Sequence, residues 1–166
     1  MPSVRRRWAA RATAAIVVLA IAGAGSAAGA ERAPWTWPLA GFRLEQSYVA
    51  PPHEYGPGHR GIDLRPLARL DVLAPANGTV AFSGPVAGRG ILTIDHGDGL
   101  VTTFEPILST LAPGAAVARG DVVGIVDLGG HTAPGALHLG VRLDGEYINP
   151  LLLLGSVPRA VLLPCC

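Results

Sequence analysis

Short apolar runs, most of them alternating with polar positions, recur along the chain after residue 30, and Gly, Pro or Asp residues separate them. Such runs, when rich in β-branched residues, are typical of β-strands. The pattern predicts strands at residues 78–83, 90–95, 100–105, 121–127, 137–142 and 146–150. No window of ten or more residues beyond Ala30 carries a convincing helical period.

The segments between these runs have the chemistry of tight turns. HGDG at 96–99 and LDGE at 143–146 supply Asp-Gly pairs, which favour two-residue hairpins. The stretch 111–126 indicates a strand, a tight turn and another strand. With 166 residues in total, the chain is predicted to be all-β, a single compact domain of antiparallel sheets in a barrel-sandwich-like arrangement.

The first thirty residues have the pattern of a signal peptide. Four arginines lie within the first eleven residues, an uncharged apolar run covers 14–24, and small residues at 28–30 form a cleavage site. We therefore expect residues 1–30 to be removed, leaving Glu31 as the mature N-terminus. The alternative is an uncleaved anchor, because the uncharged run from 12 to 30 is nearly long enough to cross a bilayer. Both interpretations predict a secreted or cell-wall-associated protein.

Removal of this segment leaves nine basic and twelve acidic residues, a net charge of about −3. This balance argues against a nucleic-acid partner, which would require a basic surface. No stable membrane insertion is expected after cleavage. The two cysteines, Cys165 and Cys166, are adjacent, and Cα atoms about 3.8 Å apart are too close for an ordinary disulfide. They favour either an intermolecular bridge that links a dimer or a pair of free thiols.

Three residues have the spacing and chemistry of zinc ligands. In GHRGIDL, residues 58–64, His59 and Asp63 lie four apart, and Gly61 argues against a helix. On a strand these positions share a face. A catalytic zinc takes three protein ligands, and His138 in LHLGVR is the natural third. Each residue also has a purely structural interpretation: a surface-loop histidine, a turn acid and a buried histidine.

The order of the motifs decides between these interpretations. Residues 37–154 contain, in turn, a WPL entry, GHRGIDL, VLAPANGTVAFSG, the hairpin GRGILTIDHGDGLVTTFEPI, VARGDVVGIV and LHLGVRLDGEYINPLLLL. This set resembles the lysostaphin-type zinc endopeptidases, which cut peptide cross-links in bacterial cell walls. The resemblance implies a peptidase domain at 31–154, a tail at 155–166, peptidoglycan peptides as substrate, and a groove holding Zn²⁺ on His59, Asp63 and His138.

Two positions depart from the pattern of that family. The first histidine of its His-x-His pair falls on Ala136, and the histidine of its Tyr-x-His arrangement falls on Pro106. In the family these histidines orient the attacking water and stabilise the developing oxyanion, which alanine and proline cannot do. Loss of one positioned acid or base typically costs about 10²- to 10⁴-fold in rate.

Two other residues are candidates for the missing catalytic groups. His131 lies in the Gly/Pro-rich loop GGHTAPGALH, and its imidazole titrates near neutral pH. Glu105 precedes Pro106, and its side chain would face the metal only if it turned inward at the end of the strand. The structural alternatives are an exposed loop histidine and an edge-strand carboxylate.

Two functions follow from this set of residues. The first is a secreted zinc metallo-endopeptidase that acts on peptidoglycan cross-links with weakened catalysis. The second is an inactive relative that binds cell-wall peptide or activates another cell-wall hydrolase. The sequence does not identify the cross-link.

Overall fold

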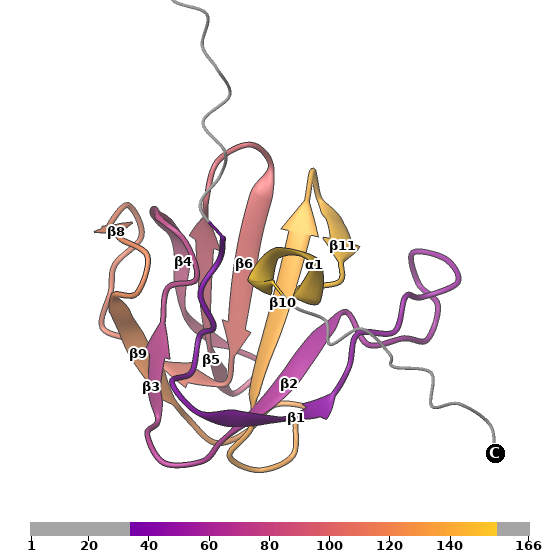
Figure 1. Cartoon of the computed structure of the whole chain (residues 1–166), viewed down its shortest axis with the longest axis horizontal. Helices are drawn as coiled ribbons and strands as arrows, with labels where there is room; N and C mark the ends of the chain where they lie inside the picture. Colours follow the sequence, from indigo (N-terminus) through magenta and orange to yellow (C-terminus); the bar gives the residue numbers. More distant parts are fainter. Residues whose placement is uncertain (1–33, 156–166) are drawn as a thin grey trace, which may run out of the picture. The chain divides into compact units, whose positions relative to one another are not determined.

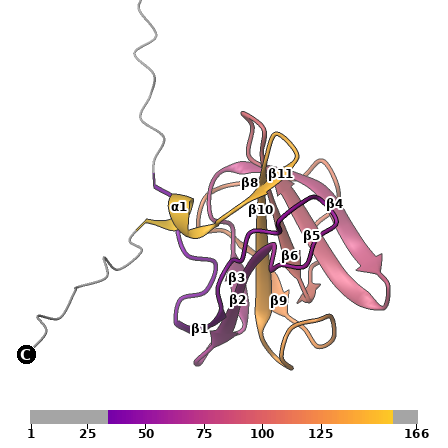
Figure 2. The same ribbon diagram turned by 90° about the vertical axis from the view of Figure 1, so that its right-hand side faces the viewer.

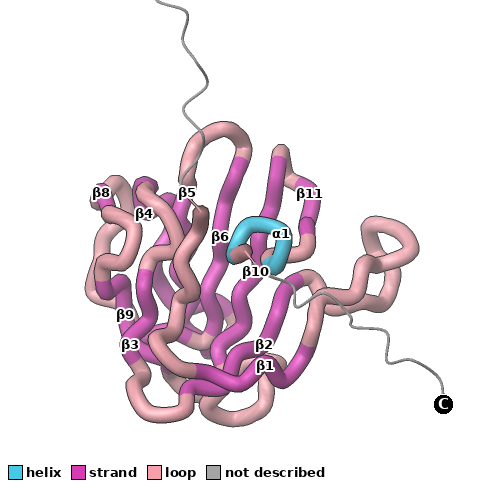
Figure 3. The backbone as a smooth tube through the Cα atoms, in the orientation of Figure 1, coloured by secondary structure: helices cyan, strands magenta, loops and turns pink. Residues whose placement is uncertain are grey.

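β-strands dominate residues 34–155, the part of the chain that the computed structural model describes (Figure 3). The expected signal peptide and both cysteines lie outside these residues. The strands are β1 (Phe42–Gln46), β2 (Gly61–Pro66), β3 (Asp71–Leu73), β4 (Gly78–Val86), β5 (Arg89–Asp95), β6 (Leu100–Glu105), β7 (Ile107–Leu108), β8 (Ala116–Val117), β9 (Val122–Val126), β10 (Leu137–Leu143) and β11 (Glu146–Ile148). The all-β prediction is confirmed.

Two antiparallel sheets form the fold. The larger has the order β1-β2-β10-β6-β5-β4-β8, and β11 pairs with β10 beside it. The smaller has the order β3-β9-β7. Figure 1 shows the long strand β10 between β2 and β6, and Figure 2 shows the sheets from the side. The site described below lies at this β2-β10-β6 centre.

Alternation along the central strands sends one face of the larger sheet into the core. Ile62 and Leu64 of β2, Leu139 of β10 and Phe104 of β6 are fully buried. They form one apolar cluster with Val72 of β3 and with residues of β7 and β9, so both sheets share a core. Successive side chains of a strand point to opposite faces of the sheet, so the residues that alternate with these buried ones lie on the other face.

The predicted strands agree closely with the observed ones. The six predicted ranges correspond to β4, β5, β6, β9, β10 and β11; the bounds of β6 agree, and those of the other five differ by at most three residues. Turn chemistry explains this agreement, because β4 to β6 and β10 to β11 are joined by local connections. Asp98 and Asp144, both in the predicted Asp-Gly turns, have the positive φ values of 49° and 51° that such turns require.

The described residues contain one short helix, α1 (Leu151–Leu154), directly after Pro150. Its four residues are too few to produce a helical period in the sequence. Within residues 34–155 no helix has the length and hydropathy needed to cross a membrane.

Candidate functional site

Three of the candidate residues form one row across the centre of the larger sheet. His138 on β10 is paired with Asp63 on β2 and, on its other side, with Glu105 on β6. Directly opposed residues of antiparallel strands project from the same face. Their neighbours along each strand point into the core, so this row lies on the face opposite the core.

Glu105 therefore faces the site by regular alternation. β6 continues in register with β10 up to Glu105, and Pro106 follows the end of the strand. The inward turn that the sequence argument required is not needed. The carboxylate is only 7% exposed, which contradicts the alternative of an edge-strand carboxylate.

His59 reaches the row from outside β2. The strand begins at Gly61, and His59 instead forms an isolated bridge with Val49, with two backbone hydrogen bonds of 2.9 Å. The expectation that His59 and Asp63 share one regular strand is thus only partly met. The ring is oriented by its Nδ1, which donates to the Ser47 carbonyl over 2.9 Å.

The ligand atoms of the three predicted metal ligands converge. Asp63 Oδ1 lies 3.1 Å from His59 Nε2 and 2.7 Å from His138 Nδ1, and the two ring nitrogens are 3.2 Å apart. Tetrahedral zinc with bonds of about 2.0–2.1 Å holds its ligand atoms roughly 3.3 Å from one another. Two imidazoles and a carboxylate at this spacing fit Zn²⁺.

The proton positions also favour a cation here. The Ser47 carbonyl only accepts, so His59 Nδ1 carries a hydrogen and the Nε2 of a neutral His59 presents a lone pair. That lone pair points at a carboxylate oxygen. Either a second proton or a metal ion between them removes the repulsion.

The surroundings of Asp63 lower its pKa and so favour the ionised carboxylate. Burial raises its pKa, but the hydrogen bond from His138 and the positive charges of His138, His59 and His131 together lower it below its usual value. An ionised carboxylate is the form that binds a metal.

His131 approaches the same cluster from the loop between β9 and β10. One ring nitrogen of His131, one each of His59 and His138, and a carboxylate oxygen of Asp63 all lie within 4.8 Å of one another. Its ring centroid is 4.7 Å from that of His138 and 6.3 Å from that of His59. His131 thus stands beside the three predicted ligands at a wider spacing than they have among themselves.

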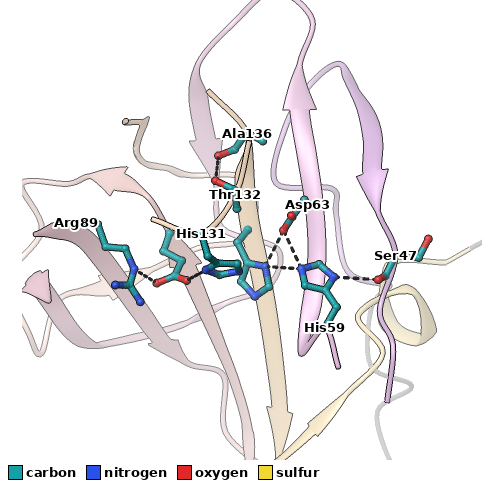
Figure 4. Close-up of polar contacts among 9 residues, drawn as sticks. Ser47, His59, Asp63, Arg89, His131, Thr132 and Ala136 are labelled. Atoms are coloured by element: carbon teal, nitrogen blue, oxygen red, sulfur yellow. Dashed lines mark hydrogen bonds and ion pairs between the residues drawn. The ribbon is translucent and has the colours of Figure 1, made fainter. Parts of the chain in front are cut away.

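His131 is the inner end of a chain of polar contacts (Figure 4). Its Nδ1 lies 2.8 Å from Glu105 Oε1 in an ion pair, and Arg89 Nε donates to Glu105 Oε2 over 2.7 Å. An ionised carboxylate has no hydrogen to donate, so the Nδ1 that faces it is the protonated nitrogen of a neutral His131, and Nε2 carries the lone pair. The side chain of His131 is half exposed, whereas Glu105 is buried.

Local contacts fix the backbone of the loop at 127–136. Arg65 on β2 donates to the Pro134 carbonyl over 3.0 Å, and the Thr132 hydroxyl donates to the Ala136 carbonyl over 3.2 Å. The Ala136 amide donates to the Ala133 carbonyl over 2.9 Å. These contacts hold the loop so that His131 lies beside the cluster of His59, Asp63 and His138.

The two positions that depart from the family pattern, 136 and 106, carry apolar side chains in the structure. Ala136 is fully buried beneath this loop, and Pro106 follows Glu105 through a cis peptide bond. Neither side chain offers a group that transfers a proton. Any proton transfer at this site therefore involves residues other than those two.

Arg89 is the residue of the site that the sequence did not reveal. It lies between two glycines in AGRGIL, sixteen positions before Glu105, where no local spacing connects the two. Only the pairing of β5 with β6 brings them together. The contact of the Ser47 carbonyl with His59 could not be predicted either, because any residue type supplies a backbone carbonyl.

Comparison with known proteins places this arrangement in a family. The model of peptidase family M23 matches residues 57–150. An uncharacterised protein of Mycobacterium tuberculosis is 33% identical over 129 residues, which are 74% of this chain and 52% of that protein. The DD-carboxypeptidase/endopeptidase Mpg of Neisseria gonorrhoeae is 30% identical over 102 residues, 61% of this chain and 24% of that protein.

The fold agrees with a solved peptidase structure. The catalytic domain of the antimicrobial peptidase lysostaphin from Staphylococcus simulans has a TM-score of 0.60 at 18% identity, over 69% of this chain and 93% of that domain. The chain spans about half the length of the mycobacterial relatives that it matches. On the family match, which covers the cluster of His59, Asp63, His131 and His138, the chain belongs to peptidase family M23 and has the lysostaphin-type fold.

Proposed function

We propose that this chain is an extracytoplasmic zinc metallo-endopeptidase that hydrolyses peptide cross-links of peptidoglycan. The single observation that carries the proposal is the convergence of three zinc-type ligand atoms beside a histidine whose second nitrogen is bound by a carboxylate. Membership in a family of metallopeptidases and the N-terminal segment support the chemistry and the location.

His59, Asp63 and His138 hold the metal. Zn²⁺, when bound, polarises the scissile carbonyl and lowers the pKa of the water that it holds. The three residues are only 4% to 7% exposed, so the carboxylate and the imidazoles meet their ligand in a site largely shielded from bulk water.

His131 performs the proton transfers. Its Nε2 accepts a proton from the attacking water and returns it to the amine that leaves when the peptide C–N bond breaks. Glu105 keeps the Nδ1 proton in place, so that Nε2 presents its lone pair to the cluster. His131 thereby replaces the group absent at Ala136, and Glu105 acts through His131.

Purified peptidoglycan provides the test. We expect zinc-dependent release of peptide ends by the wild type, about one Zn²⁺ per chain, and loss of most zinc in His138→Ala or Asp63→Ala. His131→Ala should keep its zinc and lose about 10²-fold or more in kcat. A protein without zinc after metal reconstitution would remove the basis of the proposal.

A second candidate is a zinc-containing binder of cell-wall peptide, or an activator of another hydrolase. The observation that favours it is the absence of proton-transferring side chains at Ala136 and Pro106. Such a protein would co-sediment with peptidoglycan without releasing peptide ends, and His131→Ala would not change that result. Turnover thus separates the two functions.

A further inference from the structure

We propose that Arg89 is a positioning residue that holds Glu105, and through it the ring of His131, in the orientation required for proton transfer. The inference rests on the proposed role of His131. It assigns a function to a residue that contacts neither the metal ligands nor the position of the scissile bond.

The first observation is that each oxygen of the Glu105 carboxylate has a partner. Oε2 accepts a hydrogen bond from Arg89 Nε over 2.7 Å and Oε1 lies 2.8 Å from His131 Nδ1 in an ion pair, while the residue is 7% exposed. A buried carboxylate needs such partners, because water cannot replace them there. With one donor on each oxygen, rotation of the carboxylate would break both contacts at once.

The second observation is that Arg89 also supports the His131 loop directly. A Cβ on Gly130 would lie 3.1 Å from Arg89 Cδ, and one on Gly129 would lie 3.8 Å from Arg89 Cβ. The backbone of the two residues before His131 therefore packs on the aliphatic part of Arg89. Arg89 contacts the loop through its stem and holds the catalytic pair through its guanidinium.

Loss of Arg89 has a specific chemical consequence. Glu105 would keep a single donor and could rotate Oε1 away from His131 Nδ1. A histidine without that acceptor loses the bias toward the Nδ1–H tautomer, and the Nε2–H form cannot accept a proton from water. The fraction of molecules with the useful tautomer falls, while the metal ligands stay as they are.

The experiment compares Arg89→Met, Arg89→Lys and the control Arg69→Met in the purified, zinc-loaded protein. Arg69 forms an exposed ion pair with Asp71 at the other sheet, so its loss removes an arginine and an ion pair away from the site. Three quantities are measured: zinc affinity, the ¹⁵N signals of the His131 ring at pH 8, and kcat and KM on peptidoglycan peptides.

Arg89→Met should lower kcat by about 10- to 100-fold, as is typical for groups that orient an active-site histidine. KM and zinc affinity should stay near wild type, and the His131 signals should shift away from the Nδ1–H tautomer. Arg89→Lys, which keeps a cation near Glu105, should restore part of kcat and of the signal. Arg69→Met should match the wild type in all three.

Unchanged His131 signals in a folded Arg89→Met protein would overturn the inference, as would a loss of zinc affinity equal to the loss of kcat. If Arg89→Met does not fold, Arg89→Leu keeps part of the aliphatic stem, offers no donor to Glu105 and answers the same question. A wild type without any turnover defeats the proposed function, yet the ring signals still decide whether Arg89 fixes the tautomer of His131.

Discussion

At the scale of single residues, the close approach of β2 and β10 leaves no room for a side chain at Gly61, beside the proposed metal ligands. A Cβ at this position would lie 2.3 Å from the Leu139 carbonyl oxygen and 2.6 Å from Nε2 of His138. Both contacts are too short for real atoms. Any side chain here must push apart the two strands that carry Asp63 and His138.

Gly61→Ala is therefore expected to lower the free energy of unfolding by about 1–3 kcal/mol, as is usual for overpacking, and to weaken zinc binding. Gly41→Ala is the matched control, because a Cβ there meets no atom within 4 Å. Urea titration and zinc analysis measure the two effects. Equal stability and equal zinc content of the two variants would contradict the described approach.

A second prediction at this scale moves the proposed catalytic imidazole from position 131 to position 136. Residue 136 directly precedes β10 and lies two positions before His138, so with an extended backbone a histidine there projects toward the face that carries His138. In the background of His131→Ala, which removes a ring 4.7 Å from that of His138, Ala136→His should recover part of kcat. A double variant as inactive as His131→Ala alone would show that position 136 does not reach the cluster.

The residues of the site differ in how visible they are in the sequence. His59, Asp63 and His138 stand in motifs, and the structure brings their ligand atoms together as predicted. The candidates His131 and Glu105 turn out to be partners, which the sequence did not indicate because 26 residues separate them. Arg89 was missed altogether, since its identity depends on a cross-strand neighbour.

At the scale of the elements, the same distinction separates the predicted strands from the others. Strands β4, β5, β6, β10 and β11 follow from alternation and from the local turns between them. β3 has three residues and β1 is exposed along most of its length, so neither gives an apolar pattern. These two strands owe their existence to partners elsewhere in the chain, β9 and β2.

A charged cluster of Glu45, Arg43 and Arg65 links β1 to β2. Glu45 on β1 accepts hydrogen bonds from Arg65 over 2.9 Å and from Arg43 over 2.9 Å. The Arg65 and Arg43 side-chain hydrogen bonds lower the pKa of Glu45 from 4.5 to about 2. Arg65 also holds the Pro134 carbonyl, so the cluster connects the edge of the sheet to the His131 loop.

The pH dependence of stability should reveal this cluster. Because the pKa of Glu45 is lower in the folded state, its stabilisation is complete above pH 4.5 and disappears as the pH falls toward about 2. Wild type and Glu45→Gln should thus differ in urea midpoint at neutral pH and converge in acid. Glu146→Gln, at an exposed position of β11, is the control and should show no such convergence.

At the scale of the whole molecule, zinc binding should act as a folding constraint that can be measured without substrate. The three ligands come from residues up to 79 positions apart, so the unfolded chain does not present the site. A ligand at 100 times its Kd stabilises the folded state by about 2.7 kcal/mol. We expect Tm to rise by roughly 5 °C or more on addition of zinc.

Calorimetry of the zinc-free and zinc-loaded protein gives this shift. His131→Ala should retain it, because His131 lies outside the three ligands, and His138→Ala should lose it. A shift that survives in His138→Ala would locate the bound zinc elsewhere.

The row formed by Asp63, His138 and Glu105 has a dynamic consequence. It joins β2, β10 and β6, three neighbouring strands of the larger sheet, whereas β8 lies at the far end of that sheet. An ion bound to two of these strands makes their separation more costly, so amide protons in β2 and β10 should exchange more slowly with deuterium when zinc is present. Amides in β8 can open without disturbing the ion, and their exchange should keep its rate. The metal would thereby divide the sheet into a slowly exchanging centre and an unaffected margin.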